Sequence, residues 1–262
     1  MLNALTEVKA VVTGAASGLG RAVAEYLVVH GGRVLLLDQD VERGEQAAAL
    51  FGDRAMFQRC DVTSELEVDR AIMTAMAEYG AITLAVNCAG VAMAQRVVGR
   101  DRMHPVAEFR RLLEINLVGC FLVSQAAANA MQQNEPYSAD DERGVIVNTS
   151  SVAAFEGQVG QVAYSASKGG VAAMTLPLAR EFADFGVRVM TIAPAIFSTP
   201  MFDAIPEQVR SGLVADIPFP RRVGKPEEFA ALVAHIFQNP MLNGEVIRLD
   251  GAQRMPPQSG SH

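Results

Sequence analysis

Tyr164 and Lys168 lie four residues apart in the segment YSASK, a spacing that places both side chains on one face of a helix. A tyrosine phenol ordinarily loses its proton only at about pH 10, which is too high for a base that works near neutrality. A neighbouring ammonium group favours the phenolate. The pair could therefore take the proton of a secondary alcohol, or return a proton to a carbonyl oxygen.

Ser151 and Asn116 complete a candidate catalytic group with this pair. Ser151 follows the apolar run 144–150, and the carboxyl edge of a parallel sheet forms its binding crevice. A hydroxyl there can hydrogen-bond the reacting oxygen and stabilise the charge that develops on it. Asn116, in the helical segment LLEINLVG, could hold a water that links Lys168 to solvent. Singly, each of the four side chains also fits an ordinary capping, packing or surface role, so their combination is what predicts catalysis.

The segment TGAASGLG at 13–20 follows the apolar run VKAVV and precedes the helical pattern RAVAEYLV. Its glycines allow a tight turn and let the backbone approach a pyrophosphate group. The helix that follows offers unpaired N–H groups and the positive end of its dipole to such an anion. The order of strand, glycine turn and helix predicts a dinucleotide site. Its contacts are expected at Gly14, Ser17, Gly18, Leu19 and Gly20.

Asp38 ends the second apolar run, about twenty residues past the last glycine of the turn. A carboxylate at this place accepts hydrogen bonds from both hydroxyls of the adenosine ribose and repels a 2′-phosphate. Ser17 in the turn supplies no cation that would hold such a phosphate. Both observations predict NAD rather than NADP.

Seven short apolar runs are rich in branched residues and continuous rather than alternating, as expected of strands buried on both faces. They span 8–12, 33–38, 55–62, 82–87, 144–150, 187–194 and 244–251. Helical patterns lie between them at 18–30, 41–51, 65–79, 106–132, 162–185 and 226–238. This alternation predicts an α/β fold: a single Rossmann-like, doubly wound parallel sheet of about seven strands with helices on both faces.

Three segments interrupt the alternation. Residues 92–105 and 133–143 are long polar loops, whereas 195–224 carries many large apolar residues outside any strand. The last segment predicts a lid over an apolar ligand, although an ordinary helical excursion packed on the core would look the same. No linker divides the chain, so we expect one dinucleotide-binding domain over 1–255, which includes the lid at 195–224, and a disordered tail at 256–262.

Composition narrows the class of protein. Of the 262 residues, 50% are hydrophobic and 19% are charged, which excludes an intrinsically disordered chain. The formal net charge of −7 gives no general attraction to nucleic acid or to an anionic membrane. Neither is an expected partner.

The location of the protein is predicted from what the sequence does not contain. Cys60, Cys88 and Cys120 are scattered and form no CxxC pair, which is typical of reduced thiols. The four histidines show no metal-ligand spacing, so no metal is expected. The first residues carry no signal-peptide pattern, and the stretch 117–134 is too polar for a bilayer span. We expect a cytoplasmic protein.

These motifs together resemble those of the short-chain dehydrogenase/reductase family along essentially the whole chain. The family's glycine motif matches 13–20, and its Asn-Ser-Tyr-Lys tetrad falls on the four catalytic candidates. Its NNAG motif stands at 87–90 with Cys88 in place of the second Asn, and Ala195 replaces the Gly of its Pro-Gly turn. The resemblance implies an NAD site with further contacts from Asp61, Val62, Asn87, Ala89, Gly90, Tyr164, Lys168, Pro194, Phe197 and Thr199.

Within this family the chain is similar to members that oxidise 3-hydroxyacyl-CoA and accept 17β-hydroxysteroids. The similarity is carried by the segments 133–136, 151–170, 175–177, 188–194 and 243–252. It implies hydride transfer between NAD and a secondary alcohol or ketone, chiefly 3-hydroxyacyl-CoA to 3-oxoacyl-CoA. The substrate contacts expected from the resemblance and the lid are Ser151, Gln158, Gln161, Tyr164, Phe197, Met201 and Leu213.

The resemblance also implies a homotetramer. The helical segments 106–132 and 162–185 carry more apolar residues than one buried stripe needs. The residues in excess are Leu117, Phe121, Leu122, Val171 and Met174.

Arg96, Arg100 and Arg102 stand against one acid, Asp101, in the loop 92–105. Such a positive patch on an acidic protein suits the phosphates of coenzyme A, although three arginines can also simply solubilise a long loop.

Three other functions stay open. The chain could oxidise a hydroxysteroid or another hydrophobic alcohol without CoA, or act as an NADPH-linked 3-oxoacyl carrier-protein reductase, which Asp38 disfavours. It could also bind the cofactor as a scaffold without turnover, against which the intact tetrad argues.

Overall fold

The computed structural model describes residues 3–100 and 103–257, and strands alternate with helices through this part of the chain. The strands are β1 (Lys9–Thr13), β2 (Arg33–Asp38), β3 (Ala55–Arg59), β4 (Leu84–Asn87), β5 (Gly144–Thr149), β6 (Val187–Pro194) and β7 (Val246–Leu249). The helices are α1 (Gly18–Val29), α2 (Val41–Phe51), α3 (Glu65–Tyr79), α4 (Val106–Leu113), α5 (Gly119–Met131), α6 (Val162–Phe182), α7 (Pro200–Asp203), α8 (Glu207–Ala215) and α9 (Pro226–Gln238).

All strand pairs are parallel, and the sheet order is β3-β2-β1-β4-β5-β6-β7. The chain builds outward from β1 to β3 and then crosses to the other side of β1, where β4 begins the second half. The connections that leave β1 and β4 therefore diverge, and open α/β sheets bind ligands at such a switch point. The predicted doubly wound parallel sheet is confirmed.

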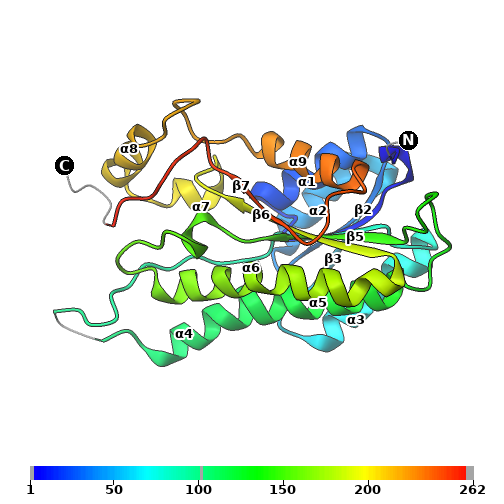
Figure 1. Ribbon diagram of the computed structural model, residues 1–262, viewed down its shortest axis with the longest axis horizontal. Coiled ribbons are helices and arrows are strands. Elements are labelled where there is room, and N and C mark those ends of the chain that lie inside the picture. The colour runs from blue at the N-terminus through cyan, green and yellow to red at the C-terminus, as the bar shows by residue number, and fades with distance from the viewer. Residues whose placement is uncertain (1–2, 101–102, 258–262) are drawn as a thin grey trace.

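Helices cover both faces of the sheet. Figure 1 shows α1, α2 and α9 on one face and α3 to α6 on the other. Neighbouring residues of one strand divide between two cores: Val12 packs with Phe229 of α9, whereas Val11 packs with Val123 of α5. Because both faces are covered, nearly every position of the central strands β1, β4 and β5 is buried, which explains the continuous apolar runs.

Local capping explains why several predicted helix ends are confirmed. The side chain of Asp40 accepts a hydrogen bond from Arg43 N at the start of α2. Ser64 does the same for Glu67 N at the start of α3, and both residues are typical N-caps. Helix α3 ends at Gly80, whose φ of 73° lies in the left-handed region that favours glycine.

Strands β4 and β7 are shorter than the expected runs 82–87 and 244–251, and the structure departs further from the expected elements in three places. Strand β3 ends at Arg59 instead of residue 62, because the Asp61 side chain accepts hydrogen bonds from the amide and the hydroxyl of Thr63 and turns the chain. The predicted helix 106–132 is divided by a π-helical turn, η3 (Glu114–Val118). The segment 195–224 contains two short helices, α7 and α8.

The run from Val106 to Met131 is long and apolar enough, by length and composition alone, to cross a membrane. In the fold, α5 packs against α3 and against strands β4 and β5, and α4 packs against α6. This packing accounts for its apolar character as a core helix of a layered protein. Of the residues expected to favour association, Phe121 is exposed, but Val171 is fully buried within the chain and cannot contribute to a surface. The homotetramer stays a prediction.

Two predicted segments lie partly outside the described residues. Of the expected disordered tail, Pro256 and Pro257 differ from the prediction, because their carbonyl oxygens accept hydrogen bonds from Gln158 Nε2 and Val159 N. Residues 258–262 lie outside the described part of the chain. In the loop 92–105, positions 101 and 102 also lie outside it, so Arg102 of the expected positive patch is not placed.

A buried ion pair joins the loop after α5 to strand β6. Arg188 and Glu142 lie 2.8 Å apart, and their side chains are only 7% and 5% exposed. Arg188 also donates hydrogen bonds to the carbonyl oxygens of Leu242 and Phe237. Glu142 accepts a further hydrogen bond from Asn3. This pair fixes the amino end of the sheet, opposite the edge where the strands end.

We expect Glu142→Ala to lower the free energy of unfolding by about 3–5 kcal/mol, because it leaves the buried guanidinium of Arg188 without a counter-charge. Urea denaturation followed by circular dichroism measures the change. Glu42→Ala, which removes an exposed carboxylate on α2, is the matched control and should change stability by no more than about 0.5 kcal/mol. Equal effects of the two substitutions would contradict a structural role for the pair.

Candidate active site

A cleft of about 410 Å³ opens at the carboxyl ends of the strands, at the switch point between β1 and β4. The glycine turn and Asp38 line one part of it. Ser151, Tyr164 and Lys168 line the other part. The sequence-predicted dinucleotide site and catalytic group therefore share one cavity.

Glycine is required in the turn because two backbone segments, at Gly14 and at Ala89, approach each other closely. Gly14 has a φ of 64°, and a Cβ atom added there would lie 2.8 Å from Ala89 N, closer than real Cβ atoms come. A Cβ atom on Gly20 would overlap the carbonyl group of Gly14. Helix α1 begins at Gly18, and the N-cap Ser17 makes no side-chain capping hydrogen bond. The N–H groups of the first turn are thus left to an anion in the cleft.

The carboxylate of Asp38 is fixed by two backbone amides. Its Oδ2 accepts a hydrogen bond of 3.0 Å from Ala16 N in the glycine turn, and its Oδ1 accepts one of 3.0 Å from Asp40 N. A carboxylate offers about four lone-pair sites, so both oxygens can still accept a second donor. Asp38 is therefore oriented at the cleft with room for a vicinal diol.

Lys168 and Tyr164 meet on the same face of α6, as their spacing predicts. The Lys168 ammonium lies 5.9 Å from the centroid of the Tyr164 ring and donates a hydrogen bond of 2.8 Å to the carbonyl oxygen of Thr149. Ser151, two residues further along the chain from Thr149, accepts a hydrogen bond from Ala153 N at its Oγ. That bond leaves the Ser151 hydroxyl proton free to be donated to a ligand.

Asn116, the fourth member of the predicted catalytic group, does not line the cleft. In the π-helical turn its side chain exchanges two hydrogen bonds with the backbone of Val91, at 2.8 and 2.9 Å, and donates a third to Ser167 Oγ at 3.1 Å. A Cβ atom on Gly90 would lie 3.2 Å from Asn116 Oδ1 and 3.5 Å from Lys168 Nζ, so Gly90 separates the two groups. Asn116 holds the loop that carries Gly90, and its expected water relay stays a prediction.

Asn87 also lies away from the cleft, in a buried network behind the sheet edge. Its Nδ2 donates hydrogen bonds to Asn148 Oδ1 at 2.8 Å and to Ser124 Oγ at 3.1 Å. Thr13, which was not among the predicted site residues, accepts hydrogen bonds at its Oγ1 from both Cys88 N and Ala89 N. These contacts fasten the ends of β1, β4 and β5 to one another.

The structure thus separates the predicted site residues into two groups. Those that line the cleft are Gly14, Ser17, Gly18, Leu19, Gly20, Asp38, Val62, Ala89, Gly90, Ser151, Tyr164, Lys168, Pro194, Phe197, Thr199 and Met201. Those that do not line it are Asp61, Asn87, Asn116, Gln158, Gln161 and Leu213.

Local packing explains several of the residues that do not line the cleft. The Asp61 carboxylate is engaged in its own turn with Thr63. The Gln158 amide donates to Pro256 O, and Gln161 Oε1 accepts from Gln158 N. Leu213 is buried in α8, and its side chain is thus covered by the protein.

Further residues line the cleft without having been predicted. Arg111 and Ile115, from α4 and η3, and Gln39 and Cys60, beside the ends of β2 and β3, are among them. No motif marks these positions. They reach the cleft because α4 and β3 pack beside it, which a local pattern does not show.

Comparison with known proteins agrees with the fold and the family that the motifs indicate. Residues 8–210 match the family described as short chain dehydrogenase. The chain is 52% identical over 250 residues to 3-hydroxyacyl-CoA dehydrogenase type-2 from Homo sapiens, covering 95% of each chain. The crystal structure of 3-hydroxyacyl-CoA dehydrogenase type-2 from Mycobacterium avium is similar with a TM-score of 0.90 and 40% identity, covering 95% of this chain and 96% of that one. A 3-ketoacyl-(acyl-carrier-protein) reductase from Brucella melitensis, crystallised with NADH, is similar with a TM-score of 0.83 and 27% identity, covering 94% and 98%.

The cysteines are free thiols, and two of them, Cys60 and Cys88, line the cleft. Burial raises the pKa of the Cys88 thiol to about 11, although the Thr149 hydroxyl and the Lys168 charge act in the opposite direction. Burial likewise raises the pKa values of Cys60 and Cys120 to about 12. All three thiols are therefore kept protonated near neutral pH.

We expect the folded protein to react with iodoacetamide at about pH 8 roughly 100-fold more slowly than the unfolded chain, because raising the pKa of a thiol by about two units reduces its thiolate fraction by that factor. The rate should rise as the pH approaches the raised pKa values. Intact-mass spectrometry with and without urea measures the difference. Equal rates for folded and unfolded protein at this pH would show that burial does not protect the thiols.

Proposed function

This chain belongs to the short-chain dehydrogenase family, and from that premise we propose that it oxidises 3-hydroxyacyl-CoA to 3-oxoacyl-CoA with NAD. As a member of the family it is an oxidoreductase with a nicotinamide cofactor. One observation carries the proposal: Ser151, Tyr164 and Lys168 meet in the same cleft as the glycine turn and Asp38. The names of its relatives suggest the substrate.

The described residues fit a dinucleotide. Gly14 and Gly20 allow a turn so tight that a Cβ atom at either position would collide with backbone, and the first turn of α1 offers its N–H groups to the pyrophosphate. Asp38, fixed by Ala16 N, would accept the hydroxyls of the adenosine ribose and repel a 2′-phosphate. We therefore propose NAD rather than NADP. When bound, NAD supplies the acceptor for the hydride that leaves the carbinol carbon.

The proton steps belong to the chain's own residues. The Tyr164 phenol oxygen would take the hydroxyl proton of the substrate as the carbon–oxygen double bond forms. The Lys168 ammonium, anchored by Thr149 O, lies 5.9 Å from the ring centroid and places a positive charge beside the phenol. The free Ser151 hydroxyl would donate to the same substrate oxygen and stabilise its negative charge. In the reverse direction Tyr164 returns the proton to the carbonyl oxygen.

The cleft has an apolar side, and no described residue of the basic loop 92–105 belongs to its lining. Phe197 and Met201, from the segment 195–224, line the cleft and would contact an acyl chain. Arg96 is exposed on the loop 92–105, which lies beside the segment after β5 because Gln95 N donates to Gly160 O. We propose that this loop meets the phosphates of coenzyme A.

A single assay tests the proposal. The purified protein is given NAD with (S)-3-hydroxybutyryl-CoA, and in parallel with a 17β-hydroxysteroid, while the absorbance of reduced nicotinamide is followed. Turnover of the thioester with a higher kcat/KM than the steroid is the expected result. Turnover of the steroid alone would make the chain a dehydrogenase of CoA-free alcohols, and NADH binding without any turnover would make it a cofactor-binding scaffold.

Tyr164→Phe should lower kcat by about 10²–10⁴-fold, because the phenol oxygen is the group that exchanges the proton. NADH binding, measured by fluorescence titration, should persist, since the ring remains. Tyr26→Phe, which removes a hydroxyl from α1 on the opposite side of the sheet, is the control and should keep the wild-type rate. A Tyr164→Phe enzyme with the wild-type rate would assign the proton transfer to another residue.

Asp38→Ala should reduce the ratio of kcat/KM for NAD to that for NADP by at least about tenfold, because it removes a charge that repels the 2′-phosphate. Steady-state kinetics with both cofactors measure the ratio in both proteins. Asp53→Ala, an exposed carboxylate in the turn before β3, should leave the ratio unchanged. A wild-type enzyme that prefers NADP would refute the role given to Asp38.

A further inference from the structure

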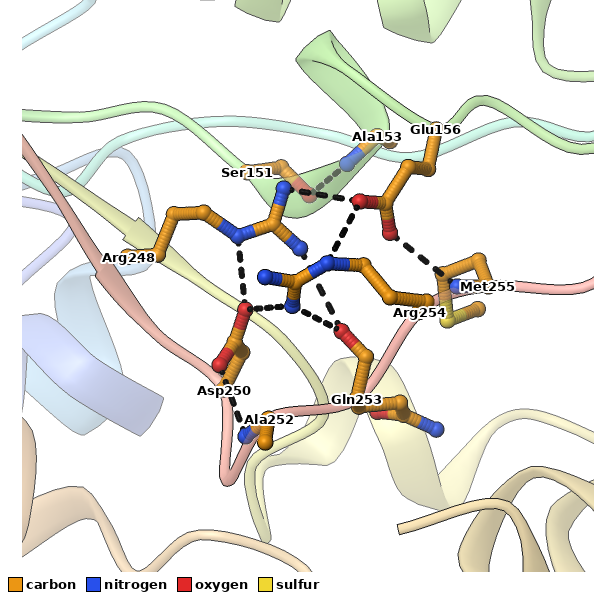
Figure 2. Close-up of polar contacts among 9 residues, drawn as sticks. All are labelled: Ser151, Ala153, Glu156, Arg248, Asp250, Ala252, Gln253, Arg254 and Met255. Atoms are coloured by element: carbon orange, nitrogen blue, oxygen red, sulfur yellow. Dashed lines mark hydrogen bonds and ion pairs between the residues drawn. The ribbon is translucent and has the colours of Figure 1, made fainter. Parts of the chain in front are cut away.

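Four charged side chains form a ring beside the catalytic serine, as Figure 2 shows. Glu156 Oε1 lies 2.9 Å from Arg248 Nη1 and 3.2 Å from Arg254 Nε. Asp250 Oδ2 lies 2.7 Å from Arg248 Nε and 3.0 Å from Arg254 Nη1. Each carboxylate thus bridges both guanidinium groups. The function proposed above does not use any of these four residues.

Glu156 belongs to the loop between the two groups that would touch the substrate oxygen. This loop, residues 152–161, begins directly after Ser151 and leads into α6, whose first turn carries Tyr164. The guanidinium of Arg248 also lies over the ring of Phe155, 5.5 Å from its centroid. A shift of the loop would therefore alter the position of Ser151 relative to Tyr164.

Of the other three charged residues, Arg248 belongs to β7, whereas Asp250 and Arg254 lie in the segment that follows this strand. Residues 250–257, here termed the C-terminal arm, run along the loop: Met255 N donates to Glu156 Oε2, and the carbonyl oxygens of Pro256 and Pro257 accept from Gln158 Nε2 and Val159 N. Together with the ion-pair ring, these hydrogen bonds form a continuous line of contacts between the arm and the loop 152–161, here called the seam.

The arm also makes a buried contact with α8. Gln253 is fully buried, and its Nε2 donates a hydrogen bond of 2.8 Å to the carbonyl oxygen of Leu213 in α8. The arm thus spans the distance between α8 and the loop 152–161. Glu156 is the loop's charged contact with the arm, whereas Gln158 and Val159 make neutral contacts.

The ring is more than one exposed ion pair. Glu156 and Arg248 are only 22% and 23% exposed, and Asp250 is 9% exposed. Burial by itself would raise the pKa of the Glu156 carboxyl, but hydrogen bonds from Arg248 and from Met255 N, with the two guanidinium charges, lower it overall. The carboxylate is therefore ionised at neutral pH. Networks of this kind hold geometry better than isolated surface pairs, which contribute little.

We propose that Glu156 is a positioning residue for the dehydrogenase reaction: its ion pairs with Arg248 of β7 and Arg254 of the C-terminal arm hold the loop in place and so set Ser151 relative to Tyr164. The proposal rests on the function proposed above, because it takes Ser151 and Tyr164 as the groups at the substrate oxygen. The glycine turn follows β1 and Asp38 ends β2, and within the described part of the chain the ion pairs of the ring involve neither strand. Glu156 should therefore act on the substrate end of the cleft and not on the cofactor end.

Glu156→Gln removes the charge and keeps the size of the side chain. It should lower kcat/KM for (S)-3-hydroxybutyryl-CoA by about tenfold, because small misplacements of reacting groups carry penalties of that order. The dissociation constant for NADH, measured by fluorescence titration, should stay at the wild-type value. Glu181→Gln, the same change at an exposed position of α6, is the matched control and should alter neither quantity.

Two further variants separate positioning from a general structural role. Glu156→Asp keeps the charge and should restore part of the lost kcat/KM. Arg248→Gln should also impair turnover, and adding Glu156→Gln to it should cause a smaller further loss than Glu156→Gln causes alone, because the Glu156–Arg248 pair is already broken while the Glu156–Arg254 pair remains. Losses that multiply in the double variant would overturn the proposal, as would an Asp variant no better than the Gln variant.

Hydrogen exchange supplies a readout that needs no turnover. The amides of Val159 and Met255 are bonded across the seam and should exchange faster in Glu156→Gln, while amides of α1 keep their wild-type rates. Wild-type kinetics and wild-type exchange in this variant would refute the positioning role. An equal loss of NADH affinity, or a lower melting temperature with faster exchange throughout the protein, would also refute it in favour of a structural role. Failure of the wild-type enzyme to oxidise the thioester would instead overturn the proposed function.

Discussion

The close approach of the ends of β1 and β4 is the constraint on which the rest of the site depends. Gly14 lies so near Ala89 that a single added carbon would collide with its backbone, and Thr13 Oγ1 holds the amides of Cys88 and Ala89. The two strands are neighbours in the sheet although β2 and β3 lie between them in the sequence. Because the chain diverges from this point in two directions, a cleft opens there, and each half of the fold supplies one of its walls.

The two halves contribute different chemistry to that cleft. The first half presents neutral backbone N–H groups and one fixed carboxylate, Asp38, which suit a diol next to a pyrophosphate. The second half presents a cation: among the described residues, the Lys168 ammonium donates its hydrogen bond to the carbonyl oxygen of Thr149 and forms no ion pair with a carboxylate. Its charge is therefore not neutralised by an ion pair and acts on Tyr164 across a largely buried site. The C-terminal arm then contacts the loop between Ser151 and α6.

The sequence alone was sufficient to predict many of the helices and strands, and those parts of the site whose residues are close together in the chain. Strand β2, strand β6 and helices α2, α3 and α9 have the predicted bounds, because apolar periodicity, N-caps and terminal glycines act within a few residues. The glycine turn was recognisable because strand, turn and helix follow one another directly. Tyr164 and Lys168 were recognisable as a pair because their spacing fixes a common helix face.

Only the tertiary structure decided which way the remaining polar side chains face. Asn116 and Asn87 belong to recognised motifs, yet both turn away from the cleft into buried hydrogen-bond networks with residues distant in the sequence. Gln158 meets the C-terminal arm, and Glu156 meets Arg248, across a separation that no local pattern records. A periodic pattern specifies the face on which a side chain lies, whereas its partner depends on how separate elements pack. For that reason the sequence predicts the catalytic pair, and the fold determines what positions it.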